Sequence, residues 1–179
     1  HEADNEDVMH NLLIAAIACG DKALIDGLTE RLKDFSPKTA WNIGENVQVE
    51  FKGTEEHAAE VLYAERVGAH QVRLRGIPQF QGTVCFDDLL LIDYKPQHYP
   101  NKGAEPLWCF PVLKVLDKGS YRRVDVPTAE YDDHAELAEQ LADAGYPVRQ
   151  EAHHQRVVVA VTPQSETEMR LIVAKIRAN

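Results

Sequence analysis

The chain has 179 residues, 44% of them hydrophobic and 27% charged, which is typical of a globular protein and not of a disordered one. Its length suits one large domain or two small ones. With 19 basic and 29 acidic side chains the formal net charge is −10. This balance argues against nucleic-acid binding, because affinity for phosphate backbones comes from Lys and Arg, and it favours a basic partner.

The longest apolar stretch, Leu12 to Cys19, is shorter than the roughly 20 residues that a membrane-spanning helix needs. The three cysteines are Cys19, Cys85 and Cys109. Their odd number and the lack of C-x-x-C spacing argue against a disulfide framework and against a zinc site. We therefore expect a cytoplasmic protein with buried free thiols, no membrane contact, and no metal or cofactor. The adjacent pair His153-His154 is interpreted as an exposed turn.

The N-terminal part has the pattern of two helices. Apolar residues from Val8 to Ile17 recur at helical spacing, and Gly20 can end this helix in a left-handed conformation. Asp21 can cap a second helix, whose apolar stripe runs from Leu24 to Phe35 and which Pro37 closes. The pair is similar to one ankyrin-type helical hairpin, but no second copy follows, so we expect no solenoid.

From Val47 onward the apolar residues alternate with polar ones, which predicts strands. The expected strands start at Val47, Val61, Val72, Leu89, Leu107 and Ser120. A turn is expected at Gly68-Ala69, and the near-continuous apolar run from Leu89 to Tyr94 predicts a strand buried on both faces. Short strands separated by turns predict a strongly bent antiparallel sheet or a small barrel.

The C-terminal part predicts a helix, a β-hairpin and a second helix. Asp132 or Asp133 can cap the first helix, and Gly145 can end it. Two strands, 148–152 and 156–162, can pair across the His153-His154 turn. Ser165 and Glu168 form a capping box for the last helix. With a preceding strand, this order is most of a ferredoxin-like unit.

The fold class that follows is α+β, in three parts. A helical hairpin is expected over residues 1–44 and a β-rich body over 45–127. A C-terminal ferredoxin-like αββα unit, packed on the body, is expected over 128–179.

No complete catalytic constellation is visible. The chain has neither a Gly-x-Ser-x-Gly elbow nor a glycine-rich phosphate loop of the common types. Cys85 and Cys109 lie in apolar, strand-like surroundings, where thiols are usually inert. A basic face could be formed by Arg73, Arg75, Arg122 and Arg123. We favour the interpretation that these arginines pair with nearby carboxylates.

Several short motifs resemble those of an uncharacterised bacterial family that is catalogued only as a domain of unknown function. They are Glu60-Val61-Leu62-Tyr63-Ala64, Arg73-Leu74-Arg75-Gly76-Ile77-Pro78, Gly82, Asp88, Gly119-Ser120-Tyr121-Arg122, Leu141-Ala142-Asp143-Ala144-Gly145 and Val159-Ala160-Val161-Thr162-Pro163. Family members usually carry Trp at the place of Tyr63 and Gly-Asp at the place of Asp87-Asp88. The resemblance covers about Val47 to Ile176 and implies a bacterial, cytosolic protein, but no activity.

The leading functional hypothesis is a non-enzymatic binding protein, most specifically an immunity protein that neutralises a cognate bacterial toxin. The partner would be a basic toxin domain, whose active site the acidic face of this chain would cover. The candidate partner-binding residues are Glu55, Glu56, Glu60, Asp87 and Asp88.

Two alternatives remain open. One is a small-ligand-binding or enzymatic module with a pocket near Asp88, Tyr121 and Arg122, in which Tyr121 and Arg122 would contact the ligand. The other is a regulatory interaction domain that acts through the N-terminal hairpin. A deep pocket with converging polar groups would favour the first alternative, and loss of partner binding on deletion of the hairpin would favour the second.

Overall fold

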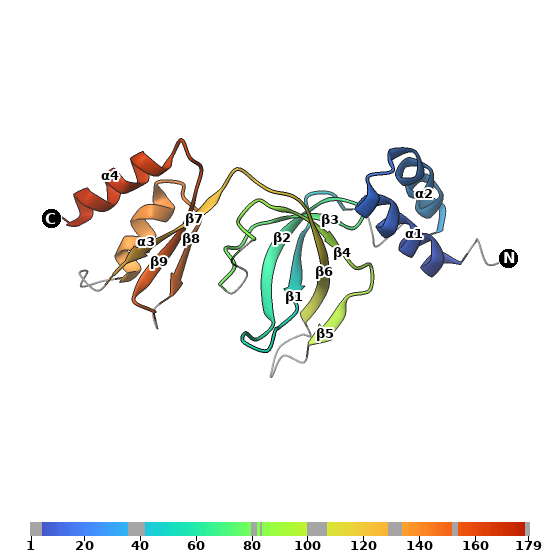
Figure 1. Ribbon diagram of the computed structural model, residues 1–179, viewed down its shortest axis with the longest axis horizontal. Helices are drawn as coiled ribbons and strands as arrows, with labels where there is room; N and C mark the ends of the chain where they lie inside the picture. Colours follow the sequence, from blue (N-terminus) through green and yellow to red (C-terminus); the bar gives the residue numbers. More distant parts are fainter. Residues whose placement is uncertain are drawn as a thin grey trace. The chain divides into compact units, whose positions relative to one another are not determined.

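The chain divides into two compact units, each of which is described by itself (Figure 1). Unit 1 comprises His1–Leu74 and Asp88–Asp117, and unit 2 comprises Arg75–Asp87 and Lys118–Asn179. The computed structural model describes residues 5–35, 42–79, 82, 84–99, 107–128, 134–151 and 154–177. The chain therefore passes from one unit to the other three times, after residues 74, 87 and 117.

Unit 1 begins with the expected helical hairpin, α1 (Glu6–Cys19) and α2 (Lys22–Phe35). The Asn5 side chain accepts a hydrogen bond from the amide of Asp7 and caps α1. Gly20, with φ at 75°, ends α1 in the left-handed conformation that glycine adopts without strain. The carboxylate of Asp21 accepts from the Leu24 amide at 3.1 Å. Both predicted boundary residues, Gly20 and Asp21, are thus confirmed.

The rest of unit 1 is a small closed barrel. Its strands are β1 (Asn46–Phe51), β2 (Glu60–Gly68), β3 (Gln71–Leu74), β4 (Leu89–Ile92) and β6 (Leu107–Asp117). Neighbours pair antiparallel in the order β1-β2-β3-β4-β6, and β1 also pairs with β6 in parallel, which closes the barrel. The short strand β5 (Gln97–Tyr99) extends the sheet from β6. Val49, Ala64, Leu74 and Leu90 are fully buried. The prediction of a bent sheet or barrel is confirmed.

The helical hairpin packs on the barrel through apolar and aromatic contacts. Met9, Leu13 and Leu32 form one cluster with Leu91 of β4, which explains why β4 carries buried residues in succession. Beside this cluster, two buried histidines face one another. Nδ1 of His10 in α1 lies 3.0 Å from Nε2 of His70, which follows β2. The His10 ring also stacks on Tyr94, with centroids 4.6 Å apart.

Unit 2 has one three-stranded antiparallel sheet in the order β7 (Arg122–Pro127), β9 (Arg156–Val161), β8 (Val148–Glu151). The helices α3 (His134–Asp143) and α4 (Glu166–Arg177) contribute Leu137, Leu141 and Met169 to its core. These residues pack against Val157 and Val159 of β9. The ferredoxin-like αββα order expected from the sequence is therefore present.

The division into units differs from the predicted boundary at residue 127. β7 pairs along its length with β9 and so belongs to unit 2, not to the barrel. The segment between β3 and β4 also belongs to unit 2, where Ile77 packs on Val158 and Ala160. Alternation of apolar residues indicates a strand but carries no information about its pairing partner, which is why the sequence placed this strand in the barrel.

In the ranges that the structure describes, no helix has the length and apolar character needed to cross a membrane.

The buried histidine pair makes the stability of unit 1 depend on pH. Burial lowers the pKa of both rings and, together with the charges of His10 and Arg66, brings the pKa of His70 to about 3. The folded unit therefore keeps His70 neutral, while the unfolded chain binds a proton below about pH 6.5. The contribution of the neutral pair is fully present above pH 6.5 and is lost as the pH falls toward 3.

As the pH is lowered from 6 to 4, we expect the free energy of unfolding of unit 1 to fall. His70 alone should contribute up to about 1.4 kcal/mol per pH unit to this fall. His70 has φ at 56°, a conformation that Asn tolerates, so His70→Asn should remove this slope with little backbone strain. The measurement is urea unfolding at several pH values, followed by the amide signals of α1. His154→Asn, at an exposed turn, is the control and should keep the slope. Equal slopes in all three proteins would contradict the assignment.

Candidate partner-binding site

An acidic turn, Thr54–His57, lies in the loop between β1 and β2. The Thr54 hydroxyl accepts hydrogen bonds from the amides of Glu56 and His57 at 3.3 and 3.2 Å, and the Thr54 amide donates to the His57 carbonyl at 2.8 Å. A Cβ on Gly53 would lie 2.9 Å from the Ala59 nitrogen, so the loop backbone approaches itself closely here. The exposed carboxylates of Glu55 and Glu56 are therefore carried on an internally hydrogen-bonded backbone.

The strand that follows this turn exposes two large apolar side chains. Val61 and Tyr63 of β2 are 41% and 63% exposed. Because side chains alternate along a strand, both lie on the outer face of the barrel, while Ala64 is fully buried. We call Val61 and Tyr63 the β2 patch. An exposed tyrosine with an apolar neighbour is typical of the anchor residues at protein–protein interfaces.

The β2 patch was not identified as a binding site from the sequence. Val61-Leu62-Tyr63-Ala64 is apolar at four successive positions, so the pattern alone does not indicate which face is inward. The one available signal is Glu65, which lies two residues after Tyr63 and therefore shares a strand face with Val61 and Tyr63, but Glu60 places a second carboxylate on the opposite, buried face.

The structure separates the five predicted acidic residues. Glu60 is 6% exposed and Asp88 is 1% exposed, so neither carboxylate is available on an outer face. Asp87, in unit 2, pairs with Arg75 at 2.6 Å. Glu55 and Glu56 are the members of the predicted set whose carboxylates are exposed, and both belong to the acidic turn.

The negative charge is concentrated in unit 1. The residues of unit 1 include 18 acidic and 10 basic side chains, a net charge of −8, whereas those of unit 2 include 11 acidic and 9 basic ones, a net charge of −2. A field of one sign attracts oppositely charged partners and raises their association rate. The unit that carries the acidic turn is therefore the one expected to attract a cationic partner.

The residues of the predicted ligand pocket are divided between the two units. Asp88 belongs to unit 1, while Tyr121 and Arg122 belong to unit 2. The Tyr121 ring meets that of Phe86 edge-on, with centroids 5.0 Å apart, and Arg122 forms an ion pair with Glu166. Tyr121 does line an open cleft of about 280 Å³. The other lining residues are Ala144, Gly145, Tyr146, Pro147, Thr162, Ser165 and Glu168.

This cleft has the features of a packing irregularity at the surface. Its volume is below the roughly 300 Å³ at which small-ligand pockets usually begin. The Tyr146 hydroxyl donates to the Ser165 carbonyl at 3.2 Å, and the Ser165 and Thr162 hydroxyls bond to one another at 3.0 Å. The polar groups of these three residues are thus engaged in holding the start of α4.

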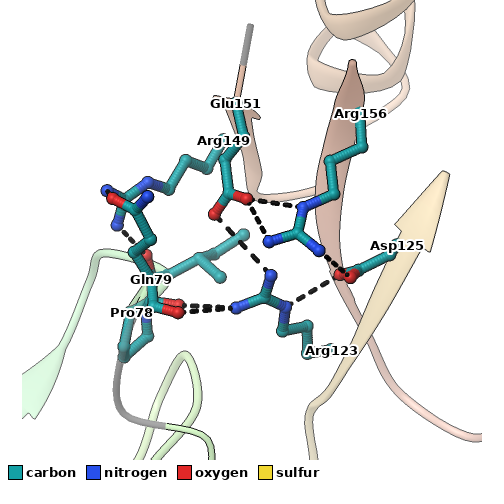
Figure 2. Close-up of polar contacts among 8 residues, drawn as sticks. Pro78, Gln79, Arg123, Asp125, Arg149, Glu151 and Arg156 are labelled. Atoms are coloured by element: carbon teal, nitrogen blue, oxygen red, sulfur yellow. Dashed lines mark hydrogen bonds and ion pairs between the residues drawn. The ribbon is translucent and has the colours of Figure 1, made fainter. Parts of the chain in front are cut away.

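The arginines of unit 2 hold the chain segment that enters from β3 (Figure 2). Arg149 donates to the Ile77 carbonyl and to the Gln79 side-chain oxygen, both at 2.8 Å. Arg123 donates to the carbonyls of Pro78 and Gln79 at 3.1 and 3.2 Å. These bonds fix residues 77–79 against one face of the sheet.

Two carboxylates balance these arginines. The Glu151 side chain is 2% exposed and accepts from Nε of Arg156 at 2.6 Å, while Arg123 lies 3.6 Å from its other oxygen. Asp125 accepts from Arg123 at 2.8 Å and from Arg156 at 2.9 Å, so the two guanidinium groups share both acids (Figure 2). With the Arg75–Asp87 and Arg122–Glu166 pairs, the interpretation that these arginines pair with carboxylates is confirmed for Arg75, Arg122 and Arg123.

The cysteines are free thiols, and two of them are at least partly buried. Cys109 is buried and donates to Gln48 at 3.4 Å, and burial raises the pKa of its thiol. The expectation of burial is wrong for Cys19, which is exposed because it lies on the outward side of the last turn of α1. Among the described residues no group of three or more His, Cys, Asp or Glu could hold a metal ion. His154 is exposed, and His153 lies outside the described residues.

No protein-family model matches the chain, and no curated protein matches it. This agrees with the resemblance to a family without an assigned activity. Among solved structures, the chain is similar to a hypothetical protein from Neisseria gonorrhoeae, with a TM-score of 0.43 and 12% identity over 75% of this chain and 87% of that chain. A likeness of this size carries no argument about function.

We expect Glu151→Gln to destabilise unit 2 by about 3 kcal/mol, because removing one member of a buried ion pair leaves its partners uncompensated. The readout is urea unfolding at pH 7, followed by the amide signals of β9. Glu139→Gln, on the exposed face of α3, makes the same charge change and should shift stability by less than about 0.5 kcal/mol. If both variants unfold at the same urea concentration, the network does not stabilise unit 2.

Proposed function

We propose that this chain is a non-enzymatic binding protein, and more specifically an immunity protein that neutralises a cognate bacterial toxin. It would do so by placing the acidic face of unit 1 over the active site of a basic toxin domain. The observation that carries the proposal is the exposure of Tyr63, at 63%, on the strand that directly follows the acidic turn.

The β2 patch would supply the apolar centre of the interface. A tyrosine loses little conformational freedom on binding and buries a large area, which is why tyrosines often dominate interface energetics. Val61 extends the apolar area along the same strand face. Tyr63 would therefore fill a pocket on the partner, and its truncation would cost much of the affinity.

The acidic turn would supply the charge that matches a basic active site. Glu55 and Glu56 are exposed, and the net charge of −8 on unit 1 would speed the encounter with a cation-rich surface. The hydrogen bonds of Thr54 hold this backbone in place before binding, which lowers the entropy cost of forming the complex. Tight binding would thus come from Tyr63, and fast association from the carboxylates.

The test is titration calorimetry against the product of the neighbouring gene, inactivated if it is toxic. We expect one-to-one binding that weakens with salt, and a loss of at least about 30-fold in affinity for Tyr63→Ala, as for an interface hot spot. The matched control is Leu171→Ala on α4, which removes an equally exposed apolar side chain from unit 2 and should bind like the wild type.

The charge contribution is tested separately, by association rates. Glu55→Gln/Glu56→Gln should slow association by about tenfold at low salt and reduce its salt dependence. Glu136→Gln/Glu139→Gln on α3 removes the same charge from unit 2 and should have a smaller effect. An absence of binding heat at any salt concentration, or equal losses in variants and controls, would overturn the proposal.

A further inference from the structure

The outer edge of β7 has no paired strand in the part of unit 2 that the structure describes. The sheet order β7-β9-β8 leaves β7 and β8 at its two edges. The unit runs strand, helix, hairpin, helix, whereas a ferredoxin-like unit carries a further strand after its second helix. An uncovered edge offers a row of main-chain N–H and C=O groups to an added strand.

The main-chain groups of Arg123 and Asp125 point to this open edge. The register of β7 with β9 continues to Thr128, whose amide donates to the Gln155 carbonyl at 2.8 Å. Because bonded and non-bonded residue pairs alternate along antiparallel strands, the even-numbered residues of β7 bond to β9 and the odd-numbered ones face away. Pro127 agrees with this pattern, because a proline in an edge strand lies where its missing N–H would face solvent.

The side chains along this edge are self-complementary. Arg123 and Asp125 lie on the same face of β7, on either side of Val124, and pair with one another at 2.8 Å. When two copies of the strand pair antiparallel about Val124, Arg123 of each copy lies opposite Asp125 of the other. The Asp125 side chain is 40% exposed, and a carboxylate has about four acceptor positions, so it can accept from a second arginine.

The neighbouring registers in which outward groups meet are disfavoured. A pairing centred on Arg123 or on Asp125 would place two like charges directly opposite one another, which destabilises a sheet. Centring on Asp125 would also set Pro127 opposite Arg123 in a bonded pair, where proline has no N–H to donate. Pairing about Val124 avoids both penalties, and so the residues of the edge select one register for a second copy of the same strand.

An apolar cleft borders the same strand. It has a volume of about 170 Å³ and is lined by Val126 of β7 and by Met169 and Val173 of α4, among others. Val124 and Val126 belong to the face of β7 that packs on this helical core. A second strand at the edge would therefore place its own Val124 on the apolar side of the sheet, and its charged residues on the side of the ion pairs.

We propose that two copies of this chain associate through the outer edges of their β7 strands, paired antiparallel about Val124. The two sheets then form one continuous sheet with twofold symmetry. Arg123 and Asp125 of each copy exchange main-chain hydrogen bonds with Asp125 and Arg123 of the other. This interface belongs to unit 2, so it depends neither on the β2 patch nor on the toxin partner proposed for unit 1.

The first test uses the wild-type full chain at increasing concentration. Sedimentation equilibrium should show the mass rising from that of one copy toward that of two, and exchange of the Arg123 and Asp125 amide hydrogens should slow as the dimer forms. A mixture of isotope-labelled and unlabelled copies should give an interchain NOE between the Hα atoms of Val124, since a non-bonded pair brings its Cα atoms to about 4.5 Å. A chain that stays monomeric up to about 1 mM, or a dimer without this NOE, would overturn the proposal.

Two variants at one position separate the main chain from the side chain. Asp125→Pro and Asp125→Ala remove the same carboxylate, but the proline also removes the outward N–H. We expect Asp125→Pro to weaken dimerisation at least about 30-fold, because a donor is lost and a carbonyl left unpaired on both sides of the axis. Asp125→Ala keeps the main-chain bonds and should weaken it less than about tenfold.

The control at the other edge of the sheet is Gln150→Pro. The Pro147 carbonyl accepts from the Ala160 amide at 3.0 Å, so the same alternation points the N–H of Gln150 in β8 outward. This variant should dimerise like the wild type. A dimer that Asp125→Pro leaves intact, or that Gln150→Pro abolishes, would contradict pairing through β7. Amide signals of β9 report whether each variant is folded, and if Asp125→Pro is not, the interchain NOE of the wild type decides.

Discussion

The parallel pairing of β1 with β6 is the constraint on which the functional surfaces of unit 1 depend. It closes the barrel and so fixes which side of each strand is inward. On β2 this choice places Ala64 and Arg66 inside and Val61 and Tyr63 outside. Because the side-chain period of a strand is two, a shift of one residue would reverse every one of these positions. One register therefore places the proposed docking patch on the outer face of β2 and the buried Arg66 on its inner face.

The two units handle charge in different ways. In unit 2, Arg123 and Arg156 of the sheet are balanced by Asp125 and the buried Glu151. Arg123 and Arg149 hold residues 77–79 in place. In unit 1 the excess of acidic side chains gives a net charge of −8, and the carboxylates of Glu55 and Glu56 are exposed. Charges that are paired internally stabilise or specify a fold, whereas exposed charges of one sign act on partners. This contrast is why the proposed toxin interface lies on unit 1.

The sequence predicts local structure well and tertiary partners poorly. Gly20 ends α1 through its left-handed backbone conformation, and Asp21 caps α2 with its side chain. Both effects depend on neighbouring residues only, so they can be predicted from the sequence. The pairing of β7 with β9, and not with the barrel, depends on contacts between distant residues. The same limit explains the acidic site: Glu55 and Glu56 are exposed as expected, but burial of Glu60 and Asp88 follows from strand register, which neighbouring residues do not specify. Tyr63 is missed for the same reason, because a four-residue apolar run leaves its inward face undetermined.

The location of the interface on unit 1 is tested by following the amide signals of the isotope-labelled chain as the inactivated product of the neighbouring gene is added. We expect the signals that shift or broaden to belong to residues 54–57 of the acidic turn and to Val61 and Tyr63 on the outer face of β2. Changes confined to α1 and α2 would assign binding to the helical hairpin, and changes confined to residues 144–147 would assign it to the cleft of unit 2. Either pattern would contradict the view that the register of β2 creates the interface.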